Sequence, residues 1–254
     1  MNTLRRLLRS LHALWLRLRL AAYRRGTAIR LGPWSVVGTD GPNLYMQYKD
    51  ECLHGIYDFT TTSTRPRIID GGANIGMSIL RFRQRHPGCH ITAFEPDAGI
   101  AALCERNLQA NGITDVDLRV AALGIASGTA MFSADQGSGG RVTQEGDRVV
   151  TVETLSSHLD QMADFVKLNI EGGECEVLEE VERAGRLGNI SQMVVEYHGW
   201  PDRPPRLGQL LSLLERNGFR YLVHDLDVES GGTSKPPFRI PTDAPWFCLV
   251  YAMR

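Results

Sequence analysis

The chain has 254 residues, of which 43% are hydrophobic and 22% are charged, a balance that argues against a disordered or fibrous protein. The formal net charge of −1 hides an asymmetry, because residues 1–30 contain eight arginines and no acidic residue. The sequence therefore predicts a basic arm on an acidic body, which excludes a basic nucleic-acid-binding domain. The five cysteines are scattered without a CxxC pair, so they predict neither a disulfide framework nor a zinc site and suit a reducing compartment.

Residues 1–27 are predicted to form a basic arm with an amphipathic helix. Between residues 4 and 18, apolar side chains recur at helical spacing and arginines occupy the other face. The apolar residues are Leu4, Leu7, Leu8, Leu11, Leu14, Trp15 and Leu18, and the arginines are Arg5, Arg6, Arg9 and Arg17. No stretch reaches the ~18 consecutive apolar residues of a membrane span, and the interrupting arginines argue against a secretory signal. The helix could pack on the domain or on a second subunit, which we favour, or lie on an anionic membrane, or act as a transit peptide.

The remaining chain is divided into two parts. Residues 28–65 are predicted to form a small cap of short strands or a hairpin, because glycine and proline punctuate a strand-like pattern up to residue 57. Residues 66–254 alternate strand and helix patterns, with a glycine-rich loop expected at 127–148. Strands are expected at 68–70, 90–95, 117–121, 166–169, 193–198, 220–225 and 246–252, and helices at 76–85, 98–111, 175–184 and 207–217. This alternation predicts an α/β fold, with a mostly parallel sheet and helices on both faces.

The strongest local motif is a glycine-rich turn between a strand and a helix, Ile68-Ile-Asp-Gly-Gly-Ala-Asn-Ile-Gly76. Glycines let a ligand approach the backbone closely, and the start of a helix offers free N–H groups. Glu95 follows at the end of the next apolar strand, where a carboxylate can accept hydrogen bonds from both ribose hydroxyls. The turn alone would also suit a tight connection without a ligand, but the two features together predict a nucleoside site.

Asp70 distinguishes between the possible cofactors. A dinucleotide site keeps its turn free for a pyrophosphate, which a carboxylate directly before the glycines would repel. The same carboxylate would attract the ammonium group of a methionine moiety. The sequence therefore favours S-adenosyl-L-methionine over NAD.

Five ordered blocks resemble the FkbM-type methyltransferase family over about residues 44–254: Asp70–Gly76, Phe94–Pro96, Ala121–Gly124, Lys167–Glu174 and Val195–His198. The resemblance implies the class I methyltransferase fold, which is Rossmann-like. Its seven-stranded sheet has six parallel strands and one antiparallel strand near the C-terminus. The resemblance also implies an enzyme that transfers a methyl group from S-adenosyl-L-methionine to a hydroxyl of a sugar, a glycan or a polyketide-type small molecule.

The family motifs also assign cofactor-binding positions. The resemblance places the methionine part near Asp70, Gly72, Ala73, Asn74, Gly76 and Ser78, the ribose on Glu95, and the adenine beside Pro96 and Ala121. One position departs from the family pattern Lys-x-Asp-x-Glu-Gly, because Asn169 stands where the aspartate is expected. An asparagine keeps a carbonyl acceptor and can line the cofactor, but it cannot act as a base.

The catalytic residues are expected at the ends of the strands at 166–169 and 193–198. An alcohol must lose a proton when it is methylated, and a placed base typically adds about 10²–10⁴-fold to the rate. We predict His198 as this base, because its ordinary pKa lies near neutral pH, with Glu171 and Asn169 orienting it or the substrate. Glu174 and Glu196 could instead be structural. Asn169, Glu171, Glu196 and His198 would also suit Mg²⁺, but we favour a site without a metal.

Two other functions share part of this pattern. A nicotinamide-dependent oxidoreductase would use the glycine turn and Glu95, but Asp70 and the lack of a second dinucleotide half count against it. A catalytically silent cofactor-binding scaffold is suggested only by Asn169. The methyltransferase interpretation predicts a small-molecule or glycan acceptor, no nucleic acid and a cytoplasmic location. Peripheral membrane contact or homodimer contact through residues 1–25 is left open, as are the acceptor and the oligomeric state.

Overall fold

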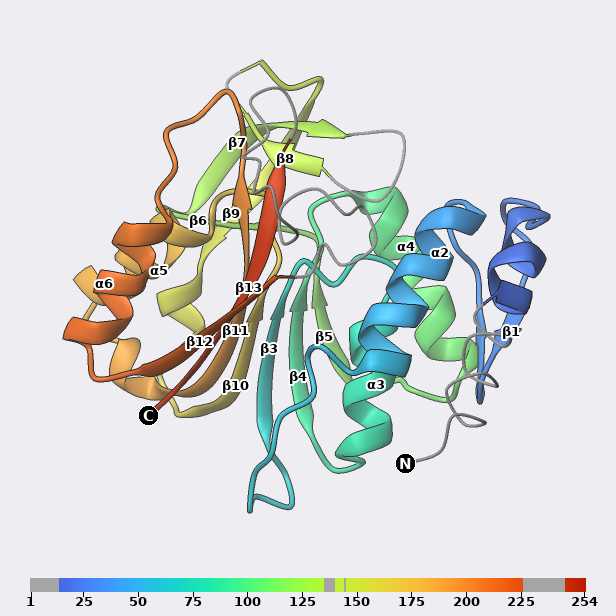
Figure 1. Ribbon diagram of the computed structural model, residues 1–254, viewed down its shortest axis with the longest axis horizontal. Coiled ribbons are helices and arrows are strands. Elements are labelled where there is room, and N and C mark those ends of the chain that lie inside the picture. The colour runs from blue at the N-terminus through green and yellow to red at the C-terminus, as the bar shows by residue number, and fades with distance from the viewer. Residues whose placement is uncertain (1–13, 135–139, 144, 226–244) are drawn as a thin grey trace, which may run out of the picture.

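The computed structural model describes residues 14–134, 140–143, 145–225 and 245–254 (Figure 1). Its centre is a seven-stranded sheet in the order β12-β13-β11-β10-β3-β4-β5. The strands are β3 (Arg67–Gly71), β4 (His90–Phe94), β5 (Val116–Arg119), β10 (Ala163–Leu168), β11 (Ile190–Gly199), β12 (Arg220–Asp225) and β13 (Trp246–Met253). Because β13 is antiparallel to both of its neighbours and all other pairs are parallel, the predicted class I methyltransferase fold is confirmed.

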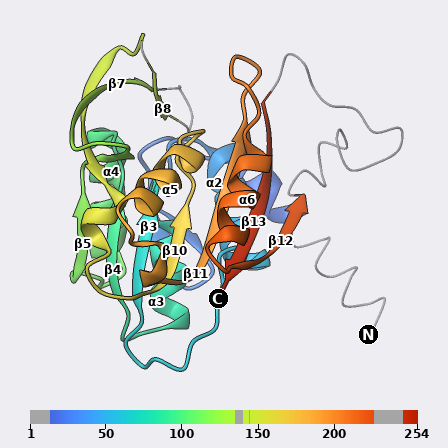
Figure 2. The same cartoon turned by 90° about the vertical axis from the view of Figure 1, so that its left-hand side faces the viewer.

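Helices cover both faces of this sheet (Figures 1 and 2). They are α3 (Met77–Arg85), α4 (Ala98–Ala110), α5 (Glu174–Arg183) and α6 (Leu207–Arg216), with short 3₁₀ turns η2 (Leu155–His158) and η3 (Leu187–Asn189). Successive strand residues point to opposite faces, so Ile68 joins one buried cluster with α3 and α4, while Ile69 joins another with α5 and α6. Packing of these two clusters on both faces fixes the positions of the strands, and therefore of the residues at the carboxyl ends of the strands.

The predicted cap is only partly correct. Residues 29–36 form the expected hairpin of β1 (Ile29–Leu31) and β2 (Trp34–Val36), but the chain then becomes helical in α2 (Gly41–Gln47) and the π-helical segment η1 (Tyr48–His54). Asp40 caps the helix, because its carboxylate accepts a hydrogen bond from the Asn43 amide at 2.8 Å. The sequence does contain two signals for this helix, Asp40 as the helix-capping residue and Pro42 in the first turn. The neighbouring glycines favoured a turn between strands, so the helix was not predicted.

The glycine-rich region expected as a loop contains strands. A four-stranded sheet in the order β6-β9-β7-β8 is formed by β6 (Ala122–Gly124), β7 (Gly128–Ala134), β8 (Gly140–Val142) and β9 (Arg148–Thr154). The loop prediction was wrong because it relied on the high content of glycine and polar residues and gave too little weight to the alternation of buried and exposed side chains. Phe132 of β7 packs with Val150 and Val152 of β9 in a small core, whereas Val149 and the intervening Thr151 are exposed.

The N-terminal arm is helical over residues 14–21, and the part of the predicted helix before residue 14 lies outside the described residues. The packed side of the helix differs from the predicted one, because Leu16 and Leu20 are buried in the main core while Leu14, Trp15 and Leu18 are exposed. The arm and the cap therefore share a core with the sheet. Among the described residues, no helix is long and apolar enough to cross a membrane.

Candidate active site

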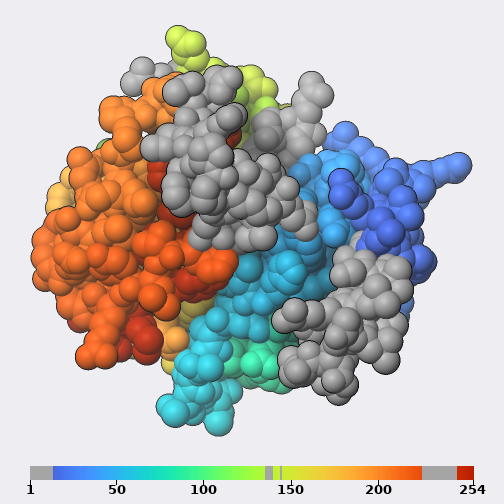
Figure 3. Space-filling view, viewed as in Figure 1, coloured from blue at the N-terminus to red at the C-terminus, as the bar shows by residue number. Residues whose placement is uncertain are grey.

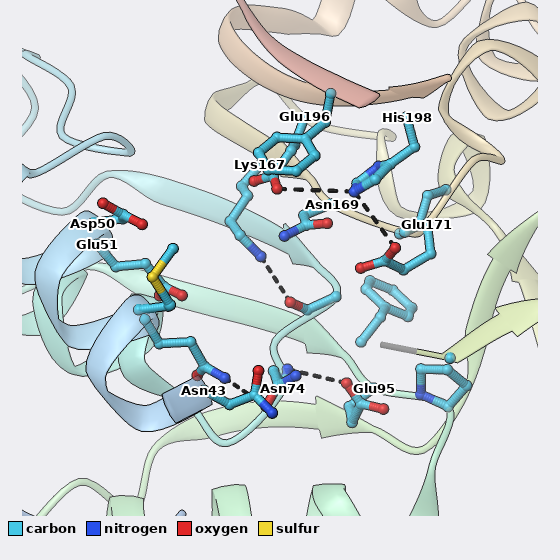
Figure 4. Close-up of a pocket in the computed structure, with 18 of the residues that line it drawn as sticks. Asn43, Asp50, Glu51, Asn74, Glu95, Lys167, Asn169, Glu171, Glu196 and His198 are labelled. Carbon is cyan, nitrogen blue, oxygen red and sulfur yellow. Dashed lines mark hydrogen bonds and ion pairs between the residues drawn. The ribbon is translucent and has the colours of Figure 1, made fainter. Parts of the chain in front are cut away.

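A cavity of about 1050 Å³ opens at the carboxyl ends of β3, β4, β10 and β11 (Figure 4). Its far sides are closed by α2 and η1 and by residues of β7 and β8. Most of the predicted site residues line it: Gly72, Asn74, Glu95, Pro96, Ala121, Asn169, Glu171 and His198. We call Asn74, Glu95, Pro96 and Ala121 the β4 wall, and Asn169, Glu171, Glu196 and His198 the β11 wall. The labelled residues of the two walls face each other across the cavity in Figure 4.

Four predicted cofactor residues do not line the cavity. Ala73 is buried. Gly76, at the start of α3, lies against Cys104 of α4. The Ser78 hydroxyl donates a hydrogen bond to the Asp70 carboxylate. The expected contact between Asp70 and a methionine ammonium is therefore wrong, since the Asp70 side chain is fully buried and paired within the protein.

The partner of Asp70 is Lys167, a residue that the sequence analysis quoted but gave no role. Its Nζ lies 2.8 Å from Asp70 Oδ1 and donates to the Gly72 carbonyl at 2.7 Å. Burial opposes the charge of Lys167, but Asp70 and Glu51 outweigh that effect and raise its pKa. The sequence signal for this ion pair was a lysine inside the otherwise apolar strand β10. In the structure, Lys167 lies opposite Asp70 in the register of β3 and β10. This buried ion pair fixes the glycine turn to the sheet.

Gly72 is required by the packing of the turn. Its φ of 85° is in the left-handed region, and a Cβ there would lie 1.8 Å from the Asn169 carbonyl oxygen. The amides of Gly72 and Ala73 both donate to the Phe94 carbonyl, at 3.0 and 2.8 Å. The glycine therefore lets the turn fit between the ends of β4 and β10, and the cavity-facing position of Asn74 follows from this.

Glu95 is the central residue of the β4 wall. It is 7% exposed, and its carboxylate accepts hydrogen bonds from the Asn74 amide at 3.0 Å and the Asp97 amide at 2.9 Å. Burial raises the pKa of Glu95 to about 7, while the two amide hydrogen bonds oppose that rise. The carboxylate is thus oriented by backbone and is poised to ionise near neutral pH.

His198 is surrounded by carboxylates on the β11 wall. Its Nδ1 lies 3.1 Å from Glu174 Oε1, and its Nε2 lies 3.4 Å from Glu171 Oε2 and 3.8 Å from Glu196 Oε1. Burial would lower the pKa of His198, but the hydrogen bond to Glu174 and the three negative neighbours raise it to about 9. The reason given for predicting His198 as the base is therefore wrong, because the imidazole holds its proton at neutral pH.

Glu171 is held in an unusual conformation by the residues around it. Its φ is 61°, a value that few residues other than glycine adopt. Glu174 Oε1 accepts the amides of Ile170 and Gly172, and the Trp200 indole donates to the Glu171 carbonyl at 3.0 Å. Backbone strain of this kind is concentrated at functional sites, where the surroundings enforce it.

Tyr57 and Glu51 belong to the same cavity, and the sequence analysis did not identify either. The Tyr57 hydroxyl donates to Glu196 Oε2 at 2.5 Å and accepts from Asn169 Nδ2 at 3.4 Å. Burial raises the pKa of Glu51 to about 8, with Lys167 opposing the rise. Both residues come from the segment predicted as strands, and no local motif marks them. Only their position opposite β10 and β11 brings them into the site.

The side chains around His198 bring one imidazole and three carboxylates together. Within the described ranges, no group of three or more histidine, cysteine or acidic residues has the arrangement that could hold a metal ion.

The chain was then compared with known proteins. A family model described as the methyltransferase FkbM domain matches residues 70–221. Methyltransferase sdnD from Sordaria araneosa is 24% identical over 233 residues, which cover 76% of this chain and 87% of that protein. Methyltransferase 1 from Beauveria bassiana is 25% identical over 209 residues, which cover 71% of this chain and 82% of that protein.

Among solved structures, the crystal structure of methyltransferase FkbM from Methylobacillus flagellatus is similar to this chain, with a TM-score of 0.50 and 15% sequence identity. The match covers 96% of this chain and 59% of that one, so this chain spans less than two thirds of that protein, and the likeness shows the fold alone. The family model, by contrast, spans more than half of the chain and contains the blocks from Asp70 to His198. This chain therefore belongs to the FkbM methyltransferase family.

Proposed function

We propose that this protein is an S-adenosyl-L-methionine-dependent O-methyltransferase acting on a hydroxyl of a sugar, a glycan or a polyketide-type small molecule. The observation that carries this proposal is one cavity with two chemically different walls, with Glu95 on the β4 wall and the Glu171–His198 pair on the β11 wall. The cavity volume of about 1050 Å³ is at the top of the roughly 300–1000 Å³ range of small-molecule sites. It is large enough for a cofactor and an acceptor together.

The β4 wall fits a nucleoside. The Glu95 carboxylate can accept hydrogen bonds from ribose hydroxyls, and Pro96, Ala121 and Leu123 offer apolar surface for a purine. Asn169 adds a second point of attachment, because its Oδ1 is buried and has no hydrogen-bond partner among the described residues. An ammonium N–H is a suitable donor to that oxygen. When bound, S-adenosyl-L-methionine would supply an electrophilic methyl group, from whose carbon a nucleophilic oxygen would displace the sulfonium sulfur as a neutral thioether.

The β11 wall suits the removal of a proton from an alcohol. His198 is protonated at neutral pH, so a carboxylate must take the hydroxyl proton. Glu171 is the most accessible of the three carboxylates around His198, with 26% of its side chain exposed, compared with 13% for Glu196 and 1% for Glu174. We assign Glu171 as the proton acceptor, His198 as the cation that orients it, and Glu174 as the group that positions both.

The lining also favours a hydroxyl-bearing acceptor. Trp200, Trp246 and Phe247 contribute aromatic faces to the cavity, close to the carboxylates of the β11 wall. Aromatic faces pack against the apolar face of a ring, while carboxylates accept hydrogen bonds from its hydroxyls. Holding such an acceptor in line contributes more than the base, because orientation lowers the barrier by roughly 7–11 kcal/mol.

Calorimetric titration with S-adenosyl-L-methionine and, separately, with NADH tests the cofactor. We expect binding of the former alone and its loss in Glu95→Ala; binding of NADH alone would overturn the proposal. A panel of glycosides and phenols with methyl-labelled cofactor then tests the acceptor. A labelled ether resists mild alkali, whereas label released by mild alkali would indicate a methyl ester and would contradict transfer to a hydroxyl.

A further inference from the structure

The helix at residues 14–21 has apolar side chains on two opposite sides. Leu16 and Leu20 are 2% and 1% exposed and pack into the main core. Leu14, Trp15 and Leu18 are 54%, 53% and 65% exposed, and they lie about 180° away around the helix. Packing against the domain therefore accounts for Leu16 and Leu20 but leaves the second apolar side on the surface.

The helix is fixed to the domain, so this second side has a defined orientation. The Leu20 carbonyl approaches Gly41 so closely that a Cβ at Gly41 would lie 1.8 Å from it. The Tyr23 hydroxyl accepts from the Gly38 amide at 2.9 Å and donates to the Thr27 carbonyl at 2.7 Å. A rotation of the helix that buried Leu14 and Leu18 would expose Leu16 and Leu20 and break these contacts.

The charged residues of the arm itself are all basic. Arg17, Arg19, Arg24 and Arg25 are all exposed, and the first acidic residue of the chain is Asp40. The Arg19 guanidinium lies 5.3 Å above the Trp15 ring, at the border between the apolar and the basic surface. We define the arm surface as Leu14, Trp15 and Leu18 with these four arginines. The segment that carries them is dark blue in Figure 3, next to the lighter blue segment that contains α2.

We propose that the arm surface binds the surface of a membrane that contains anionic lipids. Leucine and tryptophan side chains enter the boundary between headgroups and acyl chains, while arginines bind lipid phosphates. A second copy of this chain is the less suitable occupant, because two arm surfaces would bring the same four arginines together. Arg17 and Met46 also line the cavity, and Met46 is 43% exposed, so the bound protein would hold one rim of the cavity at the membrane surface.

Vesicle sedimentation of the full chain tests this proposal. We expect binding to vesicles of phosphatidylcholine with phosphatidylglycerol, little binding to phosphatidylcholine alone, and weaker binding as salt is raised. Leu14→Ser with Trp15→Ser and Leu18→Ser should reduce the partition coefficient more than tenfold. Arg24→Gln with Arg25→Gln should reduce it about fivefold for each arginine. A control with Ile125→Ser and Val149→Ser replaces two residues that are 59% and 67% exposed, one directly after β6 and one in β9, and it should bind as the wild type does.

Circular dichroism melting and cofactor titration check that each variant is folded, because none of the replaced side chains is buried. Equal sedimentation of the wild type and the triple arm variant would overturn the proposal, as would the absence of binding to the anionic vesicles. Light scattering of the protein without vesicles tests whether a second copy of this chain covers the arm surface instead of a membrane. A dimer that the triple variant converts to monomer would show that a second copy covers the arm surface and would overturn membrane binding.

Discussion

The two walls of the cavity face each other but are assembled in different ways. The β4 wall is made by consecutive strand–turn–helix units, and backbone amides of Asn74 and Asp97 orient Glu95. The β11 wall is held by side chains from distant parts of the chain, such as Tyr57, which donates to Glu196 across 139 positions. A nucleoside can thus be recognised by a local backbone motif. A side chain that accepts a proton, by contrast, needs charged neighbours from several elements to set its pKa.

The walls also differ in their charge. On the β4 wall, burial raises the pKa of Glu95 to about 7, and its carboxylate accepts hydrogen bonds from two backbone amides. On the β11 wall, His198 contacts three carboxylates, and its pKa rises to about 9 as a result. Variants on the two walls should therefore affect different measurements.

Replacing Glu171 should affect turnover alone. Glu171→Gln removes the proposed proton acceptor and keeps its size, so we expect kcat to fall by about 10²–10⁴-fold. The affinity for S-adenosyl-L-methionine should change less than about threefold, as measured by calorimetry. Glu176→Gln is the matched control, because Glu176 lies in the first turn of α5, shortly after Glu171, and pairs with Arg206. If Glu171→Gln loses no more activity than this control, the proton acceptor lies elsewhere.

Replacing Lys167 should affect the stability of both walls. Lys167→Met leaves the fully buried Asp70 carboxylate without its cation, and breaking such a pair lowers the free energy of unfolding by about 3–5 kcal/mol. Urea denaturation measures this loss. The double variant Lys167→Met with Asp70→Asn removes the uncompensated charge and should recover part of it. A double variant less stable than Lys167→Met would contradict the role of the ion pair.

The β11 wall should make stability depend on pH. The pKa of His198 is about 9 in the folded protein and 6.5 in its ordinary state, so between these values the folded protein keeps a proton that the unfolded chain releases. Its contribution to the free energy of unfolding is complete below pH 6.5 and is lost as the pH rises through 9, a change of about 3 kcal/mol.

Urea denaturation of the wild type and of His198→Gln across this range measures the contribution. The wild type should lose stability more steeply than the variant. Glu51 and Glu95 titrate in both proteins, so the difference between the two curves reports the β11 wall. Parallel curves would mean that the three carboxylates do not hold the proton on His198.

The β4 wall should make cofactor binding depend on pH. An ionised Glu95 accepts ribose hydrogen bonds better than a neutral carboxyl does, and its pKa is about 7. The Kd for S-adenosyl-L-methionine should therefore fall roughly tenfold between pH 6 and pH 8. Glu95→Gln is the control, since its profile contains only the titration of the cofactor and of other groups. Identical profiles for the two proteins would remove Glu95 from the binding equilibrium.

The predictions made from sequence succeeded where the pattern was local. The strand ends at Asp70 and Glu95 are marked by apolar runs followed by polar turns, so the sheet and the position of Glu95 could be predicted. The role of Asp70 could not, because its partner Lys167 lies 97 positions away. The strands β7 and β8 were missed since short strands in a glycine-rich segment have too few alternating residues to outweigh composition.

The sequence alone determined the class of the fold, the glycine turn and the family, because periodicity and contiguous motifs are written in neighbouring residues. Tertiary structure decided which groups share the cavity. Tyr57 reaches Glu196 and Glu51 lines the same cavity, although both residues come from the segment of the chain before β3. It also decided the charge of His198, since a pKa depends on burial and on carboxylates that three-dimensional packing brings to the imidazole.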